Sequence, residues 1–136
     1  GGWLGEGEIS YAGPNALARA KLAAQTIRER VDLLELDCDL RTDLIGTVSI
    51  HDGDNGELTQ SFGGEPQEVR MRAAANTHDE ATAVLIAREV ESLYCDGPAG
   101  GGGVRRNTTW RVKTGSVLVP RKDIQPRVTM VTEDDL

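Results

Sequence analysis

The sequence has 136 residues, the usual length of one domain, and 38% of them are hydrophobic, so we expect a single domain over residues 1–136. Aromatic residues make up only 4% and the formal net charge is −7, which argues against a base-stacking surface for nucleic acid and against binding to anionic membranes. No apolar run reaches the length of a membrane span, and no basic-apolar signal peptide opens the sequence.

The first twelve residues permit a strand, with Trp3, Ile9 and Tyr11 on one side. Gly5 and Gly7 weaken that pattern, since glycine has no side chain to pack. We therefore expect a kinked strand or an ordered loop here.

A helix is predicted from about Asn15 to about Leu34, after the stop and start signal of Gly13-Pro14. Its apolar positions recur at spacings of three, four and seven residues and form one stripe. They are Leu17, Ala20, Ala24, Ile27, Val31 and Leu34.

Two strands are expected next, over residues 44–50 and 68–74, after a loop at residues 37–39. In the second of them apolar residues alternate with charged ones, which predicts a half-buried strand. The link between the strands contains Asn55-Gly56 and is too long for a two-residue turn, so it predicts a wide hairpin with an exposed arm.

The second helix is expected to begin at the capping box Thr77-His78-Asp79-Glu80 and to end near Cys95. A strand over residues 108–119, broken at Gly115, and a short strand over residues 128–132 complete the pattern. Cys38 and Cys95 are far apart, without a CxxC motif, and are expected to be free thiols.

The order of these elements, strand-helix-strand-strand-helix-strand, predicts an α+β fold. We expect a ferredoxin-like sandwich in which two helices pack on one face of a mostly antiparallel sheet. The opposite face is then solvated or covered by a partner.

The glycine run at residues 97–106 predicts backbone with positive φ or a close approach to another group. It follows a helix and precedes a strand, which is the reverse of a phosphate-binding loop. Backbone N–H groups of Gly100, Gly101, Gly102 and Gly103 still permit an anion site with Arg105 or Arg106, and a mobile or interface-packed connection is the other interpretation.

Carboxylates and histidines supply weaker candidates. Glu6 and Glu8 lie on one side of an extended segment, either as an acid and base pair or as the wet side of an edge strand. His51 beside Asp52 is poorly placed for a catalytic pair on a strand, and His78 is expected to be solvated. The acidic run at residues 52–57 lacks the spacing of a calcium loop, so neither a metal nor another cofactor is expected.

Residues 1–14 and 97–105 resemble the carboxyl-terminal region of the AtuA family, named for acyclic terpene utilisation. The resemblance implies a cytoplasmic protein of citronellol and geraniol catabolism, with a larger α/β domain before the present region. It supplies no established catalytic residue. The family places a strand upstream of Gly1, so we expect an open sheet edge there and pairing with a partner or a second copy.

The resulting hypothesis is a companion or scaffold domain that presents its two glycine-rich segments, residues 1–13 and 97–106, to a partner domain or subunit, as a homo- or hetero-oligomer. The alternatives are a binding domain for an acyl-CoA or organic acid at residues 97–106, and a hydrolase or lyase built on Glu6, Glu8 and His51. The expected contact residues are Trp3, Glu6, Glu8, Tyr11, Gly100, Gly101, Gly102, Gly103, Arg105 and Arg106.

Overall fold

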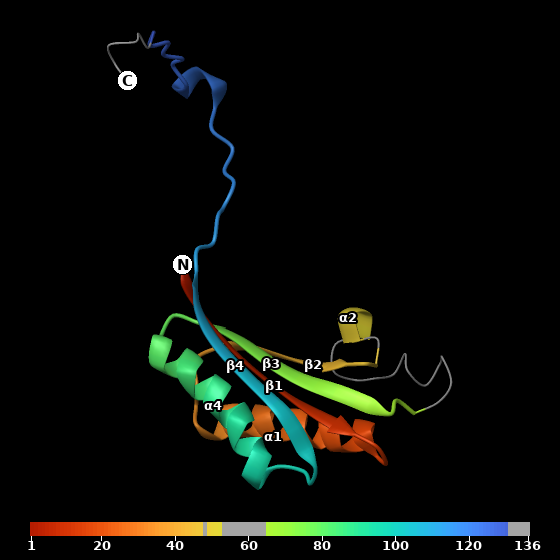
Figure 1. Ribbon diagram of the computed structural model, residues 1–136. Coiled ribbons are helices and arrows are strands. Elements are labelled where there is room, and N and C mark those ends of the chain that lie inside the picture. The colour runs from red at the N-terminus through yellow and green to blue at the C-terminus, as the bar shows by residue number, and fades with distance from the viewer. Residues whose placement is uncertain (48, 53–64, 131–136) are drawn as a thin grey trace.

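The computed structural model describes residues 1–47, 49–52 and 65–130. Two helices, α1 (Ala16–Leu33) and α4 (Glu80–Asp96), lie side by side on one face of an antiparallel sheet (Figure 1). The short helix α2 (Ser49–Asp52) lies on the other side of the sheet. The predicted α+β sandwich of ferredoxin-like type is confirmed.

The sheet of the described residues has four strands in the order β2-β3-β1-β4. Their bounds are β1 (Gly2–Ala12), β2 (Asp39–Ile45), β3 (Glu68–Thr77) and β4 (Gly101–Arg111). Strand β1 pairs with β3 on one side and β4 on the other, so the open edge expected beside Gly1 is absent from the described strands. The outer strands are β2 and β4.

The glycines of β1 admit helix α4 close to the sheet. A Cβ at Gly5 would stand 2.1 Å from the backbone oxygen of Ala83, and one at Gly7 would stand 2.4 Å from Cβ of Val90. Pairing of β1 with β3 is nevertheless continuous from Trp3 onward, so these glycines do not break the strand. The chain's own helix, and not a partner, lies against them.

The glycine run is also not a loop over most of its length. Gly101 pairs with Tyr11 and Gly102 with Ser10, inside the β1–β4 ladder. A Cβ at Gly101 would stand 2.7 Å from Cδ1 of Ile9, so the lack of a side chain again serves packing within the chain. The two glycine-rich segments therefore lie against each other.

Three predicted boundaries are wrong. Strand β2 covers 39–45 and not 44–50, because Thr47 turns the chain back by donating its N–H and its hydroxyl to the carbonyl of Leu44. Helix α4 is capped by Asp79, which accepts the N–H of Thr82, while Thr77 ends β3. Strand β4 covers 101–111 and not 108–119, because its glycines pair with β1. Residues 112–120 and 124–130 have no regular structure, so the strand expected over 128–132 is not found in its described part, 128–130.

The predicted core is aliphatic, and the largest fully buried side chains agree apart from Tyr11 and Thr47. They include Ile9, Ile27, Leu44, Met71, Ile86 and Val90. The core lies between the sheet and the helices α1 and α4, where alanines at the contact let the layers approach closely.

Gly5→Ala is expected to reduce the free energy of unfolding by about 2–3 kcal/mol, because the added methyl group meets the backbone of α4 and cannot be relieved by a side-chain rotation. Gly102→Ala is the matched control, since open space surrounds its Cβ position, and a change within about 0.5 kcal/mol is expected. Urea denaturation measures both. Equal losses in the two variants would contradict the close approach of α4.

Candidate functional site

Charged side chains of three strands form a network on the sheet face opposite α1 and α4, called here the open face. Gly5 and Gly7 point toward α4, so the alternating residues Glu6 and Glu8 point the other way. Cross-strand pairing then sets their neighbours on the same face. The polar and charged residues of the open face include Glu6, Glu8, Arg41, Asp43, Arg70, Arg72, Arg105 and Asn107.

Arginines of β3 hold the carboxylates of β1. Arg70 donates from Nε to Oε2 of Glu8 at 2.5 Å, and from Nη1 to the hydroxyl of Ser10 at 2.9 Å. Arg72 forms an ion pair with Glu6, and its Nη1 lies 3.6 Å from Oδ2 of the buried Asp43. The network thus crosses β1, β3 and β2 in succession.

The two candidate carboxylates are therefore engaged in the fold. The side chain of Glu6 is 18% exposed and that of Glu8 is 27% exposed, and each accepts from an arginine. A carboxylate held in this way strengthens the sheet by cross-strand pairing. The geometry gives no support to an acid and base pair at these positions.

Arg105 and Arg106 lie on opposite faces of the sheet. Arg106 stands across from Gly7, and its Nη1 lies 2.9 Å from Oε2 of Glu91 on α4. Arg105 stands across from Glu8 on the open face and forms no ion pair within the described residues. The two guanidinium groups do not converge on one anion.

Arg19 of α1 is a site residue that sequence reasoning missed. It donates from Nη2 to the carbonyls of Ala12 and Pro14 at 2.6 and 2.9 Å, and from Nη1 to that of Ala99 at 2.9 Å. It joins the end of β1 to the turn before β4, where Gly100 has a φ of 78°. The sequence signal for this role is a cationic side chain one turn into a helix that follows Gly13-Pro14.

The aromatic candidates divide between core and surface. Tyr11 is fully buried under the guanidinium of Arg19, 5.7 Å from the ring centre, and burial raises the pKa of its phenol although the charge of Arg19 opposes this. Tyr11 is therefore not accessible to a partner in this fold. Trp3 packs edge-on against Trp110 with 5.5 Å between ring centres, and Trp110 is 53% exposed.

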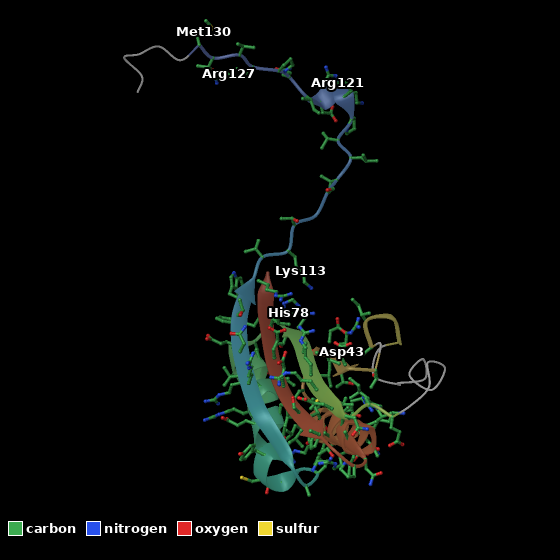
Figure 2. The ribbon with its side chains drawn as sticks, turned by 45° about the vertical axis from the view of Figure 1, so that its right-hand side comes forward. Asp43, His78, Lys113, Arg121, Arg127 and Met130 are labelled. Atoms are coloured by element: carbon green, nitrogen blue, oxygen red, sulfur yellow. The ribbon has the colours of Figure 1, made fainter. Side chains whose placement is uncertain are left out.

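A cleft lies at the end of the sheet where β1 begins and β4 ends. It is lined by Asp37, Cys38, Asp39, His78 and Lys113, among others, and Figure 2 shows His78 and Lys113 at this end. Burial raises the pKa of the Cys38 thiol, and the charges of Asp37 and Asp39 add to the effect. A raised pKa lowers the fraction of the reactive thiolate, so Cys38 is a weaker nucleophile than an unperturbed cysteine.

The remaining sequence candidates lie outside what the structure describes. The side chains of His51 and Asp52 and the acidic run to Glu57 belong to this group. Cys38 and Cys95 are both free. Within residues 1–47, 49–52 and 65–130 there is no cluster of metal-ligating side chains, and no helix is both long and apolar enough to cross a bilayer.

Arg72→Gln is expected to reduce the free energy of unfolding by about 1–3 kcal/mol, because it leaves the partly buried Glu6 without its cation and removes the weaker of the two cations at Asp43, which keeps Arg41. Arg106→Gln removes an ion pair whose side chains are about half exposed, and a loss below about 1 kcal/mol is expected. Urea denaturation at neutral pH compares them. A larger loss in Arg106→Gln would contradict the open-face network.

Alkylation by iodoacetamide at pH 8 is expected to modify the exposed Cys95 before Cys38. In a Cys95→Ser background, Asp39→Asn should speed the modification of Cys38, because it removes a charge that raises the pKa of this thiol. Asp96→Asn, distant from Cys38 in the chain, is the control. Mass spectrometry follows the rates, and an unchanged rate in Asp39→Asn would contradict the assigned cause.

Comparison with known proteins adds three findings. The family model described as "Acyclic terpene utilisation family protein AtuA" matches residues 1–130. None of the curated proteins compared with the chain matches it. A solved structure titled "De novo designed protein Foldit4" is similar in fold, with 12% identity, a TM-score of 0.54 and coverage of 82% of this chain and 100% of its own.

Proposed function

Since the chain belongs to the AtuA family, whose model matches residues 1–130, we propose that it is a companion or scaffold domain in the catabolism of acyclic terpenoids such as citronellol and geraniol. Its task is to dock onto a larger α/β domain or subunit of the same system, in the cytoplasm. The docking surface that the geometry favours is the open face together with the outer strand β4.

The open face carries this proposal. Helices α1 and α4 cover only the opposite side, and among the described elements only the short α2 lies on this side (Figure 1). The charges of the face are held in place by one another, as the contacts of Arg70 and Arg72 show. A prearranged polar surface binds with little loss of side-chain entropy.

Arg105 supplies the directed contact on this surface. It is exposed, it stands on the outer strand, and within the described residues it forms no ion pair. A guanidinium in that position donates two parallel hydrogen bonds to a carboxylate of a partner. The neighbouring Gly102 has open space at its Cβ position, so a partner backbone can approach there.

The proposed partner contact is therefore the part of the two glycine-rich segments that α4 and the core leave exposed, and not the segments as a whole. Gly5 and Gly7 are occupied by α4, and Tyr11 is in the core. The alternative binding site for an acyl-CoA or organic acid gains no support, because Arg105 and Arg106 point to different faces. No observation favours the hydrolase or lyase.

Two neighbouring arginines provide the test. Binding of the chain to the separately expressed α/β portion of the same protein system is measured by isothermal titration calorimetry. Arg105→Ala is expected to weaken binding about tenfold or more, because a buried charged contact is lost. Arg106→Ala is the matched control, and it should leave binding unchanged, since Arg106 faces α4.

The melting temperatures of both variants should stay close to that of the parent chain, because each arginine is exposed or half exposed. Absence of any binding by the parent chain would overturn the proposal. If Arg106→Ala weakens binding more than Arg105→Ala does, the docking surface lies on the helix side and the assignment to the open face is overturned.

A further inference from the structure

Residues 112–130, called here the arm, leave the end of β4 and run away from the sandwich (Figures 1 and 2). All of them are exposed. Within the described residues the arm's hydrogen bonds are confined to its own short turn η1 (Arg121–Asp123). Lys113, at the start of the arm, lines the cleft described above, and within the described residues the arm forms no hydrogen bond or ion pair with the body of its own chain.

The composition of the arm is not that of a solvated linker. Val117 is 82% exposed, Leu118 is 103% exposed and Met130 is 82% exposed. Flexible linkers are poor in such residues, because exposed aliphatic surface is unfavourable in water. Four cations accompany them against the one carboxylate of Asp123, so the arm is both aliphatic and basic. The cations are Lys113, Arg121, Lys122 and Arg127.

Residues 32–39, called here the acidic strip, have the complementary character. Their exposed aliphatic side chains are Leu33, at 73%, and Leu34, at 38%. Their carboxylates form no ion pair within the described residues, and they are Asp32, Glu35, Asp37 and Asp39. Asp32 also lies in the last turn of α1, where the helix dipole disfavours an anion. A basic partner would supply counter-charges to these carboxylates and would offset the unfavourable interaction of Asp32 with the helix dipole.

The arm and the acidic strip lie at the same end of the sheet. Strand β2 begins at Asp39 opposite Asn76, and β4 ends at Arg111 opposite Gly2, which adjoins the Trp3–Thr77 pair. Lys113 lines the cleft beside Asp37 and Asp39 of its own chain. Beyond Lys113 the arm extends away from that chain, so the acidic strip that its outer part, with Arg121, Lys122 and Arg127, meets in this conformation is that of another molecule.

We propose that the aliphatic, basic arm of one copy of this chain lies on the aliphatic, acidic strip of a second copy, and that two copies exchange arms. A two-fold axis at this end of the sheet lets each copy give and receive one arm, which closes the assembly as a dimer. Pro120 and Pro126 restrict the backbone of the arm and reduce the entropy lost on docking. This inference does not rest on the proposed companion role.

Light scattering on the purified chain of residues 1–136 alone tests the exchange. The parent chain is expected to be a dimer whose dissociation constant rises several-fold as salt increases, because exposed charges are screened. Arg121→Glu with Lys122→Glu, and separately Asp32→Lys with Glu35→Lys, should each raise the dissociation constant about tenfold or more. A one-to-one mixture of these two variants should dimerise again.

Lys21→Glu with Arg88→Glu is the matched control, because it changes the charge equally at positions on α1 and α4 outside the arm. It should stay dimeric. A monomeric parent chain overturns the proposal, and so does a dimer that survives both reversals or a mixture that stays monomeric. The larger α/β domain or subunit is not present in this experiment, so a result that overturns the arm exchange does not contradict the proposed companion role.

Discussion

The close approach of helix α4 to strand β1 is the constraint on which the rest of the structure depends. Positions 5 and 7 carry no side chain, and the backbone of Ala83 and the side chain of Val90 occupy the space where a Cβ would stand. This contact brings α4 down onto β1 and orients the alternation of the strand. Every even position of the central strand then points to the other side, where the charged network forms.

The network follows from this alternation without any further device. Glu6 and Glu8 meet Arg72 and Arg70 because antiparallel pairing places these residues opposite or diagonal to one another. Half burial makes such pairs stronger than ordinary surface pairs, since water screens them less. The helix side of the sheet therefore packs by close backbone contact, and the open face is stabilised by ion pairs.

The sequence predicts the fold class, both long helices and the alternation of helices and strands along the chain up to β4, because periodicity and turn residues carry that information. It misleads where a residue's role is set by its neighbours in space. Glycines 5 and 7 suggest a weak strand and glycines 101–103 a loop, yet Gly5, Gly7 and Gly101 serve packing between segments distant along the chain, and glycines 101–103 lie in β4. The contacts of Arg19 with three separate carbonyls are invisible for the same reason. Such contacts exist only once the sheet has formed.

The irregularity inside the glycine run has a further consequence for the surface. Arg105 and Arg106 are neighbours in an alternating strand, and the β1–β4 register shifts by one residue between the Ser10–Gly102 and Glu8–Arg105 pairs. A regular ladder continued from Gly102 would place Arg105 opposite Gly7 and Arg106 opposite Glu6, which would exchange the faces of the two side chains. The register shift at the glycines therefore decides which guanidinium meets Glu91 and which one lies on the open face.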